Sequence, residues 1–361
     1  MNHIIGVKAF AVQAQVQLVT VDENGAGQRL DNFLFRHLKG VPKTHVYRII
    51  RSGEVRVNKG RAQADTRLNP GDVLRLPPVR VSERAAEKSK AMVQMVACHA
   101  PARDFPILFE DDSFLALDKP AGVAVHGGSG VSFGVIEQLR MARPQEAFLE
   151  LVHRLDRETS GILLVAKKRS ALKNLQDQFR ERETGKTYLA LVLGHWPANK
   201  RVLDKPLHKY LLSAKAGSAE VGERRVKVVP KDDPDGMPCL TLVKVKQASQ
   251  SHSLLEVTLK TGRTHQIRVH LASEGMPIVG DDKYGDFDCN RALARADCPT
   301  PLKRMFLHAW RFQCKHPVSG KRLEFQAALP DELTQFLRQV LPDATVARNS
   351  GVIDSANPTA S

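Results

Sequence analysis

The sequence has few cysteines and no long apolar run. Its five cysteines are odd in number and form no Cys-x-x-Cys pair. This argues against a disulfide framework and against a cysteine-ligated zinc site, and it suggests reduced thiols in a cytoplasm. No run of about 18 apolar residues occurs, so we expect no transmembrane helix. The N-terminus also lacks the basic and apolar regions of a signal peptide. We therefore expect a cytoplasmic protein without a membrane partner.

Acidic residues are scarce relative to basic ones. The chain of 361 residues holds 54 Lys and Arg against 39 Asp and Glu, a net charge of +15. The excess is uneven, since residues 29–80 contain twelve Lys and Arg against four Asp and Glu, a surplus of eight. So much concentrated positive charge indicates a polyanionic partner, and nucleic acid is the usual one.

The basic segment has the pattern of two short helices followed by a β-hairpin. Apolar residues recur at helical spacing over 30–38 and 46–50, and residues 54–58 and 73–76 read as strands, with a turn at Lys59-Gly60. The order of elements and the run RIIRSGEVRVN resemble an S4-type RNA-binding domain. A solvated basic surface is the alternative. The residues expected to contact RNA are Arg29, Lys43, Arg48, Arg51, Arg56, Lys59 and Arg61.

A polar loop, HRLDRETSG at 153–161, lies between two apolar runs that read as strands. Local bonds from Thr159 and Ser160 would stiffen the loop, and Gly161 would permit a sharp return into the next strand. Asp156 would then be held rigidly, as catalysis requires. The alternative is a turn stabilised by pairing of Asp156 with Arg154 or Arg157.

A second polar cluster, LKTGRTHQIRVHLASEG at 259–275, supports the catalytic interpretation. Thr264 is placed to cap a helix that begins near Gln266. Arg263 and Arg268 are the natural counterions for Asp156, and an arginine partner would keep that carboxylate ionised and oriented. A basic, solvated helix start is the alternative.

Other motifs point to no cofactor and no metal. RERETGKT at 180–187 lacks the first glycine of a phosphate-binding loop and follows a helix rather than a strand. HGGSG at 126–130 is a weak glycine cluster, and the scattered histidines lack metal-ligand spacing. No G-x-S-x-G elbow is present, which disfavours a serine hydrolase.

The segments HRLDRETSG, KTYLALV and GRTHQIRVH followed by PIVGDDKYG resemble the signatures of the RluA-type pseudouridine synthases. This resemblance implies isomerisation of uridine to pseudouridine in RNA, without a cofactor. It implies that Asp156 is the catalytic aspartate, either as nucleophile or as a base on the sugar, with Arg268 as its partner. Tyr188 would pack on the target ring and assist proton removal from C5. Leu307 would form an apolar pocket wall, and Arg154 would occupy the space left by a flipped base.

The resemblance also implies the organisation of the chain. We expect an α+β protein with a small S4-like RNA-binding domain, followed by a pseudouridine synthase catalytic domain built on a mixed, mostly antiparallel sheet. The expected segments are an N-terminal extension (1–28), the S4-like domain (29–80), a linker (81–103), the catalytic domain (104–341) and a disordered tail (342–361). Residues 287–304 depart from the family pattern and look like an insertion, for which we expect a surface loop; a segment that contacts RNA is the alternative.

Within the family, the chain looks closest to a subgroup that acts on the large ribosomal subunit. This implies 23S ribosomal RNA or a large-subunit precursor as partner, with three modified sites, and we expect a monomer. Alternatives are a related synthase of other RNA, a non-catalytic RNA-binding assembly factor, and a carboxylate-based hydrolase. The last would need a second carboxylate, for which Glu158 is the only nearby candidate. His153 has no assigned role beyond support of the loop.

Overall fold

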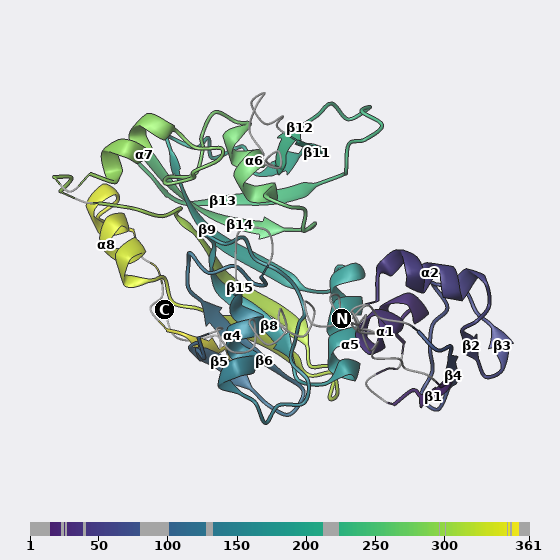
Figure 1. Cartoon of the computed structure of the whole chain (residues 1–361). Helices are drawn as coiled ribbons and strands as arrows, with labels where there is room; N and C mark the ends of the chain where they lie inside the picture. Colours follow the sequence, from purple (N-terminus) through teal and green to yellow (C-terminus); the bar gives the residue numbers. More distant parts are fainter. Residues whose placement is uncertain are drawn as a thin grey trace, which may run out of the picture. The chain divides into compact units, whose positions relative to one another are not determined.

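The computed structural model describes residues 15–22, 25, 27–38, 41–79, 101–127, 133–211, 224–295, 297–299, 301–344, 346 and 349–353. The chain divides into two units, Met1–Pro101 and Ala102–Ser361 (Figure 1). The division falls inside the segment expected to be a linker, of which residues 81–100 lie outside the described part. Residues 128–130 of the glycine cluster and 1–14 of the expected extension also lie outside it.

The first unit combines two helices with a small antiparallel sheet of strand order β1-β4-β2-β3. Its helices bury apolar residues at helical spacing, among them Leu30, Leu34, Val46 and Ile49, each at most 1% exposed. The elements are β1 (Gln17–Thr20), α1 (Leu30–His37), α2 (Lys43–Arg51), β2 (Arg56–Val57), β3 (Gly60–Arg61) and β4 (Val73–Leu76). The expected helix–helix–hairpin order is confirmed.

Two details of this unit differ from expectation. Strand β1 lies in the expected N-terminal extension but pairs with β4 along its whole length, so it belongs to the domain. The hairpin turn is formed by Asn58 and Lys59, both with positive φ (49° and 66°), while Gly60 already lies in β3. Two consecutive positive φ values match the twist of a tight hairpin.

The second unit is built on an 11-stranded sheet with the main strand order β10-β13-β14-β9-β15-β8-β6-β5. Its elements are β5 (Ile107–Glu110), β6 (Phe114–Lys119), α4 (Val135–Ala142), β7 (Glu150–Leu151), β8 (Ser160–Ala166), α5 (Arg169–Arg180), β9 (Gly185–Leu193), β10 (Val202–Asp204), β11 (Leu207–Leu211), β12 (Arg224–Val228), β13 (Leu240–Ala248), β14 (His252–Leu259), α6 (Gln266–Ala272), α7 (Phe287–Leu293), β15 (Leu307–Lys315), β16 (Arg322–Gln326), α8 (Asp331–Val340) and β17 (Gly351–Val352).

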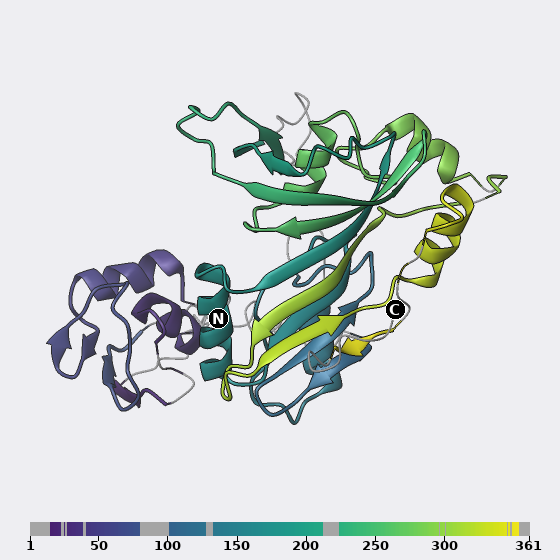
Figure 2. The same cartoon turned by 180° about the vertical axis from the view of Figure 1, so that it is seen from behind.

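Strand pairing places the ends of β8, β9 and β15 next to one another. Strands β9 and β15 lie side by side in the middle of the sheet (Figure 2). Among the described strands, β15 and β8 form the one parallel pair, and all other pairs in this sheet are antiparallel. The expected mixed, mostly antiparallel sheet is confirmed. All seven residues of β8 are buried, which explains why its sequence is continuously apolar.

The C-terminal segment and the expected surface loop are more ordered than the sequence suggests. Strand β17 pairs with β16, and the Ile353 N–H donates to the Glu324 carbonyl at 2.8 Å, so 351–353 is not disordered. Residues 354–361 lie outside the described part. Helix α7 of the 287–304 segment has no buried residue, but Leu302 and Arg304 at its end are only 3% and 9% exposed. That segment therefore returns into the core rather than forming a surface loop throughout.

Gly161 is required where the loop enters β8. Its φ is +106°, and a Cβ added there would lie 2.3 Å from the Ala309 carbonyl oxygen of β15. Replacement by alanine is expected to lower the free energy of unfolding by about 2 kcal/mol or more, because neither backbone can yield. Chemical denaturation measures this change. Gly122→Ala is the control, because Gly122 also has a positive φ (80°) but has open space around it, so this variant shows the effect of backbone strain without a collision. An equal loss in both variants would contradict the collision.

Candidate active site

The loop between β7 and β8 is fixed by bonds to a neighbouring turn. The Gly122 N–H donates to the Arg157 carbonyl at 3.0 Å, and Arg157 Nε returns a bond to the Gly122 carbonyl at 2.9 Å. The fully buried Lys119 Nζ donates to three carbonyls, those of Pro120, Val123 and Arg157, at 2.8, 2.8 and 3.1 Å. Burial lowers the pKa of Lys119 to about 7. These bonds hold the loop rigid around Asp156.

Ser160 anchors the C-terminal end of the loop. Its hydroxyl bonds to side chains distant in sequence, not to the local backbone as expected. Arg304 Nη2 donates to Ser160 Oγ at 2.7 Å, and Ser160 Oγ lies 2.9 Å from His308 Nδ1. His308 Nε2 lies 3.2 Å from the Ala327 carbonyl. Burial lowers the pKa of His308 to about 4, so the ring is neutral. The hydroxyl then donates to Nδ1 while Nε2–H donates to the carbonyl, which satisfies every group of this buried network.

His153 supports the start of the loop. The Leu164 N–H donates to its Nε2 at 3.1 Å, and the ring stacks on Phe179 and Phe312 with centroids 5.1 and 5.7 Å apart. Burial, together with the charge of Lys186, lowers the pKa of His153 to about 4. A neutral, stacked imidazole explains the histidine that the sequence left without a role.

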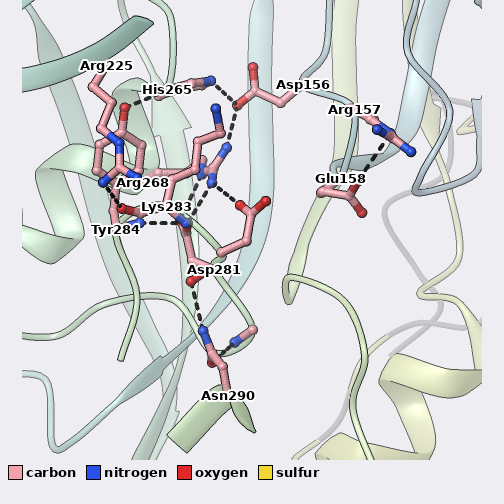
Figure 3. Close-up of polar contacts among 12 residues, drawn as sticks. Asp156, Arg157, Glu158, Arg225, His265, Arg268, Asp281, Lys283, Tyr284 and Asn290 are labelled. Carbon is pink, nitrogen blue, oxygen red and sulfur yellow. Dashed lines mark hydrogen bonds and ion pairs between the residues drawn. The ribbon is translucent and has the colours of Figure 1, made fainter. Parts of the chain in front are cut away.

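Asp156 faces two nitrogen donors from the 259–275 segment. Its Oδ2 lies 3.7 Å from Arg268 Nη1 and 3.9 Å from His265 Nε2 (Figure 3). Neither Arg154 nor Arg157 is its partner in the described contacts, since Arg157 Nε lies 3.5 Å from Glu158 Oε1 instead. The structure thus places Arg268 in the position expected for a counterion. Arg263 lines the same pocket but makes no ion pair with Asp156 among these contacts.

Arg268 is held mainly by a buried carboxylate. It donates to both oxygens of Asp281 at 2.7 and 2.5 Å, and to Asp282 at 2.9 Å, and its guanidinium lies 5.2 Å from the Tyr284 ring centre (Figure 3). Burial opposes its charge, but the bonds and charge of Asp281 outweigh burial and raise the pKa of Arg268. A permanently charged, bidentately fixed guanidinium therefore stands beside Asp156.

Helix α6 begins differently from expectation. Thr264 does not cap it; the capping position is His265, in the left-handed region with φ 53° and without a side-chain cap bond. The Gln266 side chain fixes this entry, since its oxygen accepts from the Thr261 hydroxyl and the Arg263 N–H at 2.8 and 3.0 Å. Its amide nitrogen donates to Thr241 Oγ1 at 2.9 Å. This anchor to β13 turns His265 and Arg268 toward Asp156.

A pocket of about 240 Å³ opens beside Asp156. Tyr188 from β9 and Leu307 from β15 form part of its apolar wall, and the exposed Arg154 also lines it. Burial, and then the charge of Asp156, raise the pKa of Tyr188, so its phenol is neutral. A second cavity of about 450 Å³ shares Asp156, Arg154, His265 and Arg268. The first pocket is lined by His153, Arg154, Leu155, Asp156, Thr159, Phe179, Lys186, Tyr188, Leu259, Gly262, Arg263, Thr264, His265, Gln266, Ile267, Arg268 and Leu307.

The seven basic residues of the first unit that are expected to contact RNA fall into two groups. Arg29, Arg51 and Arg61 line one cavity, but Arg29 is already paired with the nearly buried Asp31 at 2.8 Å. The others do not line that cavity; they are Lys43, Arg48, Arg56 and Lys59. Arg48 lies 3.9 Å from Glu54, while Lys43 stands over the Phe35 ring.

One group of side chains in the described segments could hold a metal ion. His208, Asp233 and Asp235 bring ligand atoms within 4.8 Å of one another. None of them lines either cavity around Asp156. Within the described segments, no helix has both the length and the apolar composition needed to cross a membrane.

Comparison with known proteins agrees with this fold. A model of the RNA pseudouridylate synthase family matches residues 113–273, and a model of the S4 domain matches 28–74. The chain belongs to the RNA pseudouridylate synthases, enzymes of RNA modification, so the resemblance to RluA-type synthases is confirmed. It is 48% identical over 331 residues to ribosomal large subunit pseudouridine synthase C of Yersinia pestis, covering 92% of this chain and 98% of that protein.

Two further relatives support the assignment. The enzyme of the same name from Escherichia coli K12 is 48% identical over 325 residues, covering 90% of this chain and 97% of that protein. The solved structure of human RNA pseudouridylate synthase domain containing 4 has a TM-score of 0.52 and 25% sequence identity. It covers 65% of this chain and 92% of that chain.

Proposed function

We propose that this enzyme isomerises uridines to pseudouridine in 23S ribosomal RNA or its large-subunit precursor, with Asp156 as the catalytic residue. The observation that carries the proposal is the Asp156 carboxylate, 3.7 Å from a fixed guanidinium at the mouth of a partly apolar pocket. The names of the bacterial relatives support the choice of substrate. The proposal includes a monomer that acts in the cytoplasm without a membrane partner.

The chemistry needs a carboxylate that acts on one sugar–base unit. The N1–C1′ bond of uridine breaks, the uracil turns, and C5 bonds to C1′; C5 loses a proton and N1 gains one, so the reaction is an isomerisation. Asp156 contributes either by attack on the sugar or by removing a proton from it. The raised pKa of the Tyr188 phenol disfavours a tyrosinate base. We therefore assign Tyr188, with Leu307, to packing against the uracil ring.

The target must leave the RNA stack before it can reach this pocket, because C1′ and C5 are not accessible in a stacked helix. Arg154 is exposed and lines both cavities around Asp156. It can therefore occupy the space that the flipped base leaves. Arg268 acts by holding and stabilising the Asp156 carboxylate.

The rival functions fit the site less well. A glycoside hydrolase needs two carboxylates around one substrate, but among the described residues Asp156 is the one carboxylate that lines the first pocket. Glu158 and Asp282 line the second cavity together with Asp156, and Asp282 accepts a bond from Arg268. Glu158 is directed to Arg157 at 3.5 Å. A non-catalytic assembly factor would not require the fixed pair of Asp156 and Arg268. A synthase of other RNA remains the second candidate, since the pocket does not encode the RNA around the target.

The test uses a bacterial strain whose own 23S pseudouridine synthase gene is deleted. The chain is expressed in that strain, and pseudouridine is mapped across 23S and transfer RNA. We expect modification to return at specific 23S positions. Modification restricted to transfer RNA would favour the second candidate, and no modification at any position would overturn the proposal.

Exposed basic residues of the first unit are expected to bind phosphates of the RNA. Neutralising Lys43, Arg51 and Lys59 to glutamine should weaken RNA binding and flatten its salt dependence. The slope of log K against log salt should fall by about 0.7 to 0.9 for each phosphate that is no longer neutralised. Filter binding between about 50 and 200 mM salt measures the slope. Lys231→Gln, which removes one positive charge at a 71% exposed side chain of the second unit, is the control for each single replacement. An unchanged slope would contradict the assignment.

A further inference from the structure

His265 adopts an unusual backbone conformation beside the Asp156 carboxylate. It lies at the start of α6 with a φ of 53°, a region that non-glycine residues seldom adopt. Its side chain is 14% exposed and lines both cavities that contain Asp156. The left-handed backbone conformation of His265 thus places the imidazole where it lines both cavities.

The contacts of His265 determine which nitrogen carries its proton. Nδ1 lies 2.8 Å from the Tyr284 hydroxyl, which itself accepts a bond from the Val226 N–H at 3.1 Å. Among the described contacts, Nδ1 is the one acceptor near the hydroxyl hydrogen, so we assign the hydroxyl as donor and Nδ1 as acceptor. Burial lowers the pKa of His265, although the charge of Asp156 opposes this. A neutral ring with this tautomer carries its proton on Nε2, the nitrogen that faces Asp156 (Figure 3).

The gap in front of Nε2 has the size for one bridging atom. Nε2 and Asp156 Oδ2 are 3.9 Å apart, which is too long for a direct hydrogen bond. One oxygen can lie within hydrogen-bond distance of both, provided that it accepts from the N–H and donates to the carboxylate. A hydroxyl does both, whereas a uracil carbonyl cannot donate and a phosphate would meet the carboxylate with like charge.

We propose that His265 Nε2–H and Asp156 Oδ2 together bind the 2′-hydroxyl of the target nucleotide. Within an RNA chain the 3′ and 5′ oxygens are esterified, so the 2′-hydroxyl is the free hydroxyl of the ribose. This contact orients the sugar on the carboxylate, and it distinguishes RNA from DNA at the target. The inference rests on the proposed function, in which Asp156 acts on the sugar–base unit.

The test compares two product oligonucleotides, which cannot react further. One carries pseudouridine at the target and the other carries 2′-deoxypseudouridine. The wild type should bind the first about 10-fold more tightly, the effect of one hydrogen bond to a charged pair. In His265→Phe, which keeps a ring, the ratio of dissociation constants should fall to about 2, because only the contact of the hydroxyl with Asp156 remains. His265→Gln keeps an N–H donor and should retain most of the ratio.

Tyr284→Phe provides a second variant that leaves the imidazole in place. It keeps the ring that packs on Arg268 but removes the hydroxyl that fixes the tautomer. The ratio should drop to about 3-fold. Each ratio compares two ligands on one protein, so a change in folding alone would not move it. An unchanged ratio in His265→Phe, or no preference in the wild type, would overturn the role of His265. Absence of pseudouridine formation by the wild type would instead overturn the proposed function.

Discussion

Replacement of Asp156 by asparagine is expected to abolish pseudouridine formation while leaving the fold and RNA binding intact. The amide has the shape of the carboxylate but cannot act as nucleophile or base, so the rate should fall by at least about 10⁴-fold. Stability should change by less than about 1 kcal/mol, because Asp156 is partly exposed and Arg268 keeps its bonds to Asp281 and Asp282. Single-turnover assays on a 23S fragment measure the rate, and thermal unfolding measures the stability.

The matched control for this variant is Glu158→Gln, the same chemical change two residues further along the loop. Glu158 is directed to Arg157 and lines the second cavity but not the first pocket, which contains Tyr188 and Leu307. Its activity should stay within about threefold of the wild type. Substantial activity of Asp156→Asn would refute the catalytic assignment. Loss of activity in both variants, with RNA binding intact, would revive a mechanism with two carboxylates.

Local sequence patterns predict the elements of this fold because their signals are periodic. Helices α1 and α2 follow from apolar residues at helical spacing over 30–38 and 46–50, and β8 follows from the apolar run after Gly161. These inferences need only residues that are neighbours along the chain. Asp156 could be singled out because its polar loop, the second polar cluster at 259–275 and the family resemblance all point to it.

The tertiary hydrogen bonds that hold the site residues in place could not be predicted in this way. Ser160 and His308 are 148 positions apart in sequence, and they meet because β8 and β15 pair in parallel. Thr264 has the chemistry of a helix cap, but the anchor of Gln266 on Thr241 places His265 at the capping position. Asp281 lies in the segment PIVGDDKYG, which carries the resemblance, yet its bond to Arg268 is a tertiary contact that no spacing indicates.

Among the residues of the site, Arg268 is the one whose replacement is expected to lower the free energy of unfolding most. Arg268→Met removes the cation from Asp281, whose side chain is 1% exposed, and leaves a buried carboxylate unpaired. The free energy of unfolding at neutral pH should fall by about 3 to 5 kcal/mol. Activity should fall as well, because the cation beside Asp156 is lost. Chemical denaturation at several pH values, with activity assays below the unfolding range, measures both effects.

The pH dependence of this loss identifies its cause. In the wild type, burial opposes the charge of Asp281, but Arg268 holds its pKa below the ordinary value. Asp281 therefore stabilises the fold above its unfolded pKa of about 4, and this stability is lost as the pH falls through the folded pKa. Without Arg268, burial raises the pKa of Asp281, and protonation relieves the penalty. The stability difference between wild type and Arg268→Met should be largest near pH 7 and should shrink toward about pH 4.

A double variant separates the two roles of Arg268. Arg268→Met combined with Asp281→Asn removes both charges, so it should recover part of the lost stability at pH 7. It should not recover activity, because Asp156 still lacks its cation. Recovery of activity would mean that Arg268 serves only to neutralise Asp281. A stability difference that does not change between pH 7 and about pH 4 would show that an unpaired Asp281 carboxylate is not the cause of the loss.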